Sequence, residues 1–209
     1  MKGPQRTAAE VLRDIQATLQ TAELGLRLLL EGSPETRLSA FRNVVVFGRA
    51  VTNALQGLRH VEPAFEEWYA PHKLEMEADP LLKYLYDLRS TILKEGRLET
   101  SSVVHIRRLS WPSDAYRLGP PPPNARGFFI GDSCGGAGWE IELPDGSVDK
   151  YYVSLPGDIG AVYAALSDAP SVHLGRPLPN RSLETLATLY VDYLRKLVRS
   201  AEGTFGGRR

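Results

Sequence analysis

Apolar residues recur at alternating steps of three and four along two early segments of the chain, which is the spacing of one helix face. In residues 12–29 they are Leu12, Ile15, Leu19, Ala22, Leu26 and Leu29. In residues 41–58 they are Phe41, Val44, Gly48, Val51, Leu55 and Leu58. The pattern predicts two amphipathic helices, and Gly48 on the second stripe indicates a close approach to a neighbouring helix.

Capping residues and prolines place the ends of the first three predicted helices. Gly32 is expected to end the first, and Ser33–Pro34 has the chemistry of an N-cap followed by a first helical residue. Pro63 can open a third helix. Pro71 is expected to break or kink that helix, because proline removes a backbone donor and clashes with the preceding turn.

A fourth helix is predicted from Asp79–Pro80 to Gly96 by the same rules. Its apolar face consists of Leu81, Leu82, Leu85, Leu88 and Ile92. Short connections between the four helices favour an antiparallel bundle over residues 5–96.

From residue 97 the apolar pattern changes to the period of two that is typical of strands. The segments "SSVVHIRRL" and "GFFIG" are strand-like. In "GWEIELPDGSVDKYYVSL" apolar residues alternate on both sides of a Pro144–Gly146 turn, which predicts a β-hairpin. Residues 97–180 are expected to form a small β-rich region with Pro- and Gly-rich loops, and residues 156–180 to be mostly loop.

The last strong pattern is helical. A helix is expected from Ser182 to Ala201, with an apolar seam of Leu183, Leu186, Tyr190, Tyr193 and Leu197. We expect residues 181–202 to pack back on the earlier elements, and the tail "GTFGGRR" to fray. The whole pattern predicts an α+β protein with a helical bundle, a small β-hairpin or sheet element and a C-terminal helix.

The composition narrows the function classes. The chain has 25 Lys plus Arg against 25 Asp plus Glu, spread over both halves, so its net charge does not favour a nucleic-acid or membrane coat. The single cysteine, Cys134, leaves no internal disulfide and no thiolate zinc cage. The segment "MKGPQRTAAEVLRDIQ" lacks an apolar signal core and no run approaches a membrane span, so a cytoplasmic protein is expected.

The end of the predicted fourth helix, "LYDLRSTILKEG", resembles the "LRNxxxH" end of the HEPN domain, a helical bundle of prokaryotic toxins and defence proteins. In active HEPN members an Arg and a nearby His cleave RNA at a dimer interface. The resemblance therefore implies an RNA-directed homodimer over residues 5–96. Arg89 matches the family's arginine, whereas Ser90 replaces the asparagine and Lys94 replaces the histidine.

The lysine changes the expected chemistry. A lysine ordinarily stays protonated at neutral pH, so it is a poor proton acceptor, although it can pair with a phosphate. Three interpretations of Lys94 remain: a basic residue that stabilises the helix end before Gly96, a binding residue, or part of an active nuclease.

Arg42, Arg49 and Gln56 lie seven residues apart and therefore share one face of the second helix. With Arg89 and Lys94, the two arginines are the candidates for an anion- or RNA-binding groove. The alternative is an ordinary solvated helix face.

The remaining motifs favour structural roles. The four histidines have no partner at metal-ligand spacing, so no metal is expected. They are His60, His72, His105 and His173. The sequence "GDSCG" matches G-x-S-x-G, but a nucleophile elbow needs a helix after the serine and here a predicted strand follows. We therefore predict that Ser133 is not a nucleophile and that loop 131–138 is mobile or a contact surface.

These observations favour a non-catalytic binding protein with a protein or RNA partner and no cofactor. The wide apolar stripes of the first two helices and the HEPN resemblance both favour a homodimer. The resemblance also implies a prokaryotic toxin or defence setting. The alternative is a HEPN-type ribonuclease that uses Arg89 with a histidine from elsewhere, such as His60 or His72. A third interpretation places an enzymatic site in the glycine-rich loop.

Overall fold

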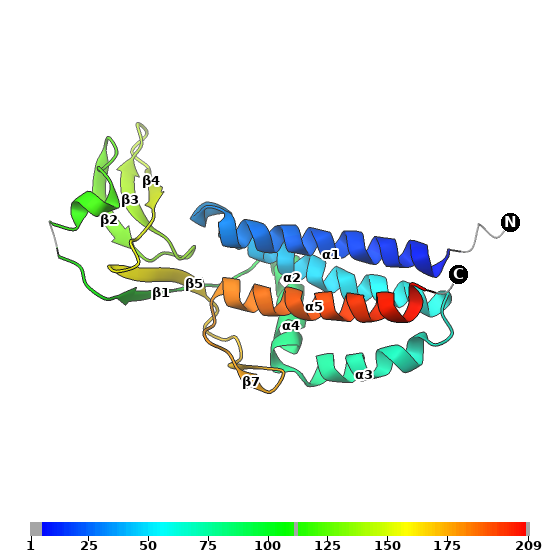
Figure 1. Cartoon of the computed structure of the whole chain (residues 1–209). Coiled ribbons are helices and arrows are strands. Elements are labelled where there is room, and N and C mark those ends of the chain that lie inside the picture. Colours follow the sequence, from blue (N-terminus) through cyan, green and yellow to red (C-terminus); the bar gives the residue numbers. More distant parts are fainter. Residues whose placement is uncertain (1–5, 111–112, 208–209) are drawn as a thin grey trace. The chain divides into compact units, whose positions relative to one another are not determined.

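The computed structural model describes residues 6–110 and 113–207, which form α-helices and small antiparallel sheets (Figure 1). This content confirms the predicted α+β class. The chain divides into two compact units, which we call the helical unit and the β unit. The helical unit comprises Met1–Gly32, Leu38–Leu98 and Ala169–Arg209, and the β unit comprises Ser33–Arg37 and Glu99–Asp168.

The helical unit is built from five helices whose apolar stripes face one another. They are α1 (Ala8–Glu31), α2 (Arg37–Leu55), α3 (Phe65–Ala78), α4 (Pro80–Glu95) and α5 (Leu183–Phe205). Helix α1 runs along α5, and α2 lies against both of them (Figure 1). Helix α3 contacts α4 and reaches α5 through the rings of Trp68 and Phe205, whose centroids are 5.4 Å apart. Burial of these stripes is the main stabilising contribution to the unit.

Glycines on the stripes allow the close helix contacts. A Cβ atom added to Gly25 of α1 would lie 3.2 Å from Ala40 and Val44 of α2. A Cβ atom added to Gly48 of α2 would lie 2.3 Å from the ring of Tyr190 of α5. The close approach predicted at Gly48 is therefore confirmed, and its partner is the C-terminal helix.

The predicted capping signals are confirmed for α4 and only in part for α2. The Asp79 side chain accepts the N–H of Leu82 at 2.8 Å, and Gly96 ends α4 in a left-handed conformation with φ of 66°. Ser33 makes no side-chain cap. The chain instead forms a 3-10 turn, η1 (Pro34–Thr36), closed by a backbone bond to the Ser33 carbonyl, before α2 begins.

The break predicted at Pro71 and the fraying predicted at the start of the C-terminal tail are both absent. Helix α3 continues through Pro71. The buried Phe65 and Tyr69 anchor the turns before the proline, and this packing outweighs one missing hydrogen bond. The tail that was expected to fray is helical as far as Phe205, and its last two residues, 208 and 209, lie outside the described part of the chain. The ring of Phe205 is buried against Trp68, which gives the last turn a tertiary anchor.

The β unit contains five strands in two antiparallel sheets. Strands β2 (Ala125–Ile130), β3 (Ala137–Glu142) and β4 (Val148–Val153) form one sheet, and β1 (Ser101–Ile106) pairs with β5 (Gly160–Ala165). The predicted hairpin is confirmed as β3–β4, with Gly146 at φ of 83° in its turn.

Residues 156–180 are mostly loops and turns, as predicted, but three strands within them were not predicted. The segment contains β5 and the short strands β6 (Val172–His173) and β7 (Arg176–Pro177), which pair with each other and belong to the helical unit. Strand β5 has the sequence "GAVYAA", in which small residues predominate and apolar and polar positions do not alternate clearly. Its partner β1 lies far earlier in the chain, so only the tertiary structure reveals the pairing.

Candidate functional site

The helical unit contains a cavity of about 570 Å³ lined by residues of α2, α3, α4 and α5. This volume falls within the roughly 300–1,000 Å³ that small-molecule sites occupy in proteins. A 3-10 turn after α2, η2 (Gln56–His60), adds further side chains to its wall. The cavity is therefore large enough for an organic ligand, and its chemistry depends on the side chains described next.

Tyr190 of α5 forms a buried wall of the cavity, with 6% of its surface exposed. Its ring fits there because residue 48 is glycine and leaves space on α2. No residue that the structure describes forms a hydrogen bond with the Tyr190 hydroxyl. The cavity therefore contains a nearly buried donor that has no protein acceptor.

Arg49 of α2 places a fixed positive charge at the cavity. Its Cζ atom lies 4.7 Å from the ring centroid of Tyr86 on α4, and its Nη1 donates to Thr52 Oγ1 at 2.6 Å. Within residues 6–110 and 113–207, no carboxylate forms an ion pair with this guanidinium. A stacked and hydrogen-bonded arginine is ready to receive an anion without further ordering.

The charged side chains of the cavity wall include more cations than carboxylates. The cations are Arg49, Arg59, Lys73 and Lys83, and the carboxylates are Glu77 and Asp87. Two cations have acidic partners, since Lys73 pairs with Glu77 and Arg59 pairs with Glu66. Lys83, like Arg49, has no acidic partner in the described part of the chain. Both remain available for the negative charge of a ligand.

The two buried tyrosines keep their protons at neutral pH. Burial raises the pKa of Tyr190, against the opposing effect of Arg49. Burial also raises the pKa of Tyr69 on α3, although Arg49 and the Gln56 side chain oppose it. Both phenols therefore act as hydrogen-bond donors towards a ligand acceptor.

The structure brings two of the four predicted site residues, Arg49 and Arg42, to the seam between α2 and α4. Arg49 contacts Tyr86 of α4, and Arg42 Nη2 donates to the carbonyl of Gly96 at 2.9 Å. Arg89 lies one turn after Tyr86 on the same face of α4. The Nε atoms of Arg42 and Arg89 are buried, with no hydrogen-bond partner among the described residues.

Lys94 does not join this seam. It is exposed in the last turn of α4, about 140° around the helix axis from Arg89. Gly96 ends the helix just after it. This is the position at which a basic side chain interacts favourably with the helix dipole.

Sequence reasoning missed most of the cavity. It placed Arg49 and Gln56 on one helix face, but it assigned Tyr190 only to an apolar seam and left Lys83 out. One signal was present: Gly48 on the apolar stripe of α2 indicated that a bulky side chain approaches there. The identity of that side chain depended on how α5 packs, which no local pattern encodes.

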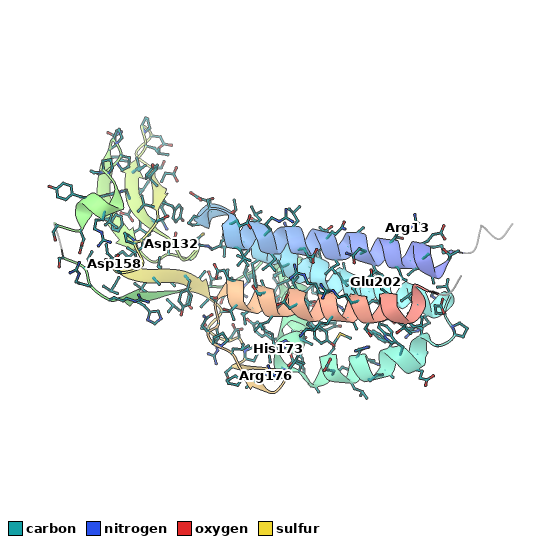
Figure 2. The ribbon with its side chains drawn as sticks, viewed as in Figure 1. Arg13, Asp132, Asp158, His173, Arg176 and Glu202 are labelled. Atoms are coloured by element: carbon teal, nitrogen blue, oxygen red, sulfur yellow. The ribbon has the colours of Figure 1, made fainter. Side chains whose placement is uncertain are left out.

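The histidines do not gather into a metal site. Among the residues that the structure describes, no group of three or more His, Cys, Asp or Glu side chains is arranged to hold a metal ion. His173 is buried, and its Nδ1 lies 3.0 Å from Oδ1 of Asp79 (Figure 2).

The described helices also lack the combination of length and hydrophobicity that a membrane crossing requires.

The glycine-rich loop of the β unit is organised by one carboxylate, Asp132 (Figure 2). Its Oδ1 accepts the N–H groups of Cys134 at 3.1 Å and Gly136 at 2.9 Å. Its Oδ2 accepts the hydroxyl of Tyr152 at 2.6 Å and the Lys150 ammonium at 2.9 Å. The prediction that this loop is mobile or a contact surface did not include these bonds. Strand β3 follows the loop directly, as predicted, so the helix that a nucleophile elbow requires is not in that position.

The Asp132 bonds predict a stability change in acid. Burial by itself would raise the pKa of Asp132, but the hydrogen bonds from Tyr152, Gly136 and Lys150 lower it overall below the ordinary value of an aspartate. The stabilisation is therefore fully present above about pH 4 and is lost as the pH falls further through the folded-state pKa. We expect Asp132→Asn to reduce the free energy of unfolding at pH 7, and the difference from the natural chain to shrink below pH 4.

Urea titrations at pH 7, 4 and 3 measure this difference. Asp149→Asn, an exposed carboxylate of the same sheet, is the control and is expected to change stability little at any of these pH values. A gap between Asp132→Asn and the natural chain that stays constant down to pH 3 would contradict the assignment.

Comparison with known families adds one relationship. Residues 32–121 match the family model described as bacteriophage lambda protein ea47. The match spans α2, α3 and α4, which carry most of the cavity wall, and extends into the β unit. It covers less than half of the chain, and its description names a phage protein without an activity. No curated protein and no solved structure matches the chain.

This match overturns the HEPN resemblance. The segment with Arg89 and Lys94 lies inside the matched region, and the family model that matches there is that of phage lambda protein ea47, not a HEPN domain. The resemblance depended on one short motif at a helix end. At the end of α4, Lys94 is a basic residue of the last turn and Gly96 is the glycine that ends the helix, so both residues have ordinary structural roles.

Proposed function

We propose that the helical unit binds a small anionic organic molecule in its cavity and does not convert it chemically. The observation that carries this proposal is Arg49, which Thr52 and Tyr86 hold in place without a carboxylate partner. The Tyr190 hydroxyl, a second donor without an acceptor, belongs to the same wall. Partly buried charges and donors are costly when unpaired, and a ligand anion would pair with both.

The chemistry of the wall supports binding rather than catalysis. General acid–base catalysis works best with a group whose pKa lies near the working pH. The pKa values of Tyr69 and Tyr190 are instead raised away from neutrality. The similarity to lambda ea47 is compatible with a binding protein in a phage setting, although it carries no activity to this chain.

We predict that Arg49→Ala weakens anion binding by about 10- to 100-fold, the range expected for loss of a charged hydrogen bond worth about 1.5–3 kcal/mol. Isothermal titration calorimetry of the full chain with inorganic phosphate, pyrophosphate, citrate and AMP measures the effect. At least one of these probes is expected to bind with submillimolar affinity and to raise the melting temperature.

The matched control is Arg13→Ala, an exposed arginine of α1 that does not line the cavity (Figure 2). It removes the same charge and is expected to leave the affinity unchanged. If all four probes fail to bind, or if Arg13→Ala weakens binding as much as Arg49→Ala, the proposal is wrong.

The predicted RNA-binding groove stays a prediction. Arg42 and Arg89 support it through their buried, unpaired Nε atoms, and Arg42 lies on the seam that also holds Arg49. Lys94 adds nothing to this seam, because it lies on another face of α4. A small ligand is favoured over a nucleic-acid strand because a cavity of about 570 Å³ with the buried Tyr190 in its wall suits a compact molecule.

A further inference from the structure

Resting on the proposed function, we infer that the ligand is a mononucleotide, held by its phosphate at Arg49 and by its base against Tyr86. Three properties of the cavity indicate this class of ligand. These are its volume, its aromatic wall and its amide side chains.

The cavity is too large to be filled by a single inorganic anion. A cavity of about 570 Å³ leaves most of its space empty around a single phosphate or sulfate. The space beyond Arg49 is lined by Met76 and Leu82 as well as by Tyr69. Such a wall favours an organic body attached to the anion, since ligand sites combine apolar surface with a few placed polar groups.

The phosphate is assigned to the donors that have no protein partner. Arg49 offers the planar fork of N–H groups that matches phosphate oxygens, and the Tyr190 hydroxyl donates from α5. Lys83 of α4 adds a point charge. Three donors from three helices suit a terminal phosphate, which carries three acceptor oxygens.

The base is assigned to Tyr86. Its ring is 51% exposed and Arg49 lies over it at 4.7 Å, so a second planar group can stack on the rest of its surface. Every nucleobase has a face that stacks on an aromatic ring. The positive charge of Arg49 beside the ring also places the phosphate site close to the stacking surface.

Two amides supply contacts for the polar edge of a base. Asn53 and Gln56 lie one helical turn apart at the cavity wall, and Asn53 is exposed without a hydrogen-bond partner among the described residues. An amide carries both a donor and an acceptor, and it matches the paired donor and acceptor on the edge of adenine. Adenosine monophosphate is therefore the probe of choice.

Calorimetry with AMP, adenosine and ribose 5-phosphate separates the two halves of the ligand. AMP is expected to bind at least tenfold more tightly than either fragment. Tyr86→Ala is expected to weaken AMP about tenfold and ribose 5-phosphate much less, because it removes the whole stacking surface but only one of the two contacts that hold Arg49, the other being Thr52. Arg49→Ala is expected to weaken AMP and ribose 5-phosphate and to leave adenosine unchanged.

The outcomes distinguish this inference from the proposed function. If citrate or pyrophosphate binds in an Arg49-dependent way but AMP binds no more tightly than ribose 5-phosphate, the cavity is an anion site and the nucleotide inference is wrong. If no anion binds at all, both fail. Melting temperatures show whether each variant is folded, and Tyr86→Phe, which keeps the stacking face, is expected to retain AMP binding.

Discussion

Replacing Gly135 with alanine is expected to destabilise the β unit by about 3–5 kcal/mol, which is a large fraction of the stability of a small domain. The backbone of Gly135 has φ of 67°, a left-handed conformation that costs other L-residues about 1–2 kcal/mol. The new methyl group would also lie 1.9 Å from the backbone nitrogen of Ala164 in β5. Backbone atoms cannot rotate aside as a side chain can. The loop or the β1–β5 pairing must therefore shift.

Hydrogen exchange of peptides from residues 125–165 measures the effect where it arises. We expect Gly135→Ala to lose most of its amide protection there. Gly146→Ala is the matched control, since Gly146 also has a left-handed φ, of 83°, but nothing lies within 4 Å of an added Cβ. The Gly146→Ala variant should lose only about 1 kcal/mol of stability, the cost of the left-handed backbone conformation for alanine. Equal losses in the two variants would show that the contact with Ala164 is unimportant.

Asp79→Ala is expected to destabilise the helical unit by about 3–5 kcal/mol, because it takes the acceptor from several donors at once, each at a cost of about 1–3 kcal/mol. The Asp79 carboxylate caps α4 at Leu82 and lies 3.0 Å from Nδ1 of His173. It also accepts the N–H of Leu174 at 2.6 Å, and Leu174 has an unfavourable φ of 46°. Alanine leaves these buried donors unpaired and releases the β6–β7 hairpin from the start of α4.

Urea denaturation followed by far-ultraviolet circular dichroism measures this loss through the helical signal. Asp14→Ala removes an exposed carboxylate of α1 that pairs with Arg6, and should change stability by less than about 1 kcal/mol. Asp79→Asn provides a second comparison. It retains one acceptor oxygen for the α4 cap but loses the charge, so we expect an intermediate stability. If Asp79→Ala loses no more stability than Asp14→Ala, the stabilising role assigned to the Asp79 hydrogen bonds is wrong.

Local patterns predicted the elements whose signals lie within a few residues. Asp79 and Gly96 bound α4 because capping bonds join neighbours in the chain. The β3–β4 hairpin was predictable because the alternation and the turn at Gly146 occupy one continuous segment. Pro71 was misread because its local penalty is real, and only the buried Phe65 and Tyr69 outweigh it.

The candidate site was only partly predictable for the same reason. Arg42 and Arg49 could be placed on one helix face from spacing alone, and the structure places both against α4 or the glycine that ends it. The cavity itself depends on Tyr190, which reaches α2 only because the last helix returns to the first ones. That approach joins residues separated by more than a hundred positions.

The sequence by itself determined the α+β class, most of the helix ends and the central hairpin, because each is specified by periodicity or capping within a short window. The tertiary structure decided what those elements meet: Tyr190 against Gly48, Asp79 against His173 and Asp132 within its loop. These contacts are long-range or depend on a particular backbone turn. Their energies come from shape and unpaired polar groups in three dimensions, which residue spacing along a chain does not record.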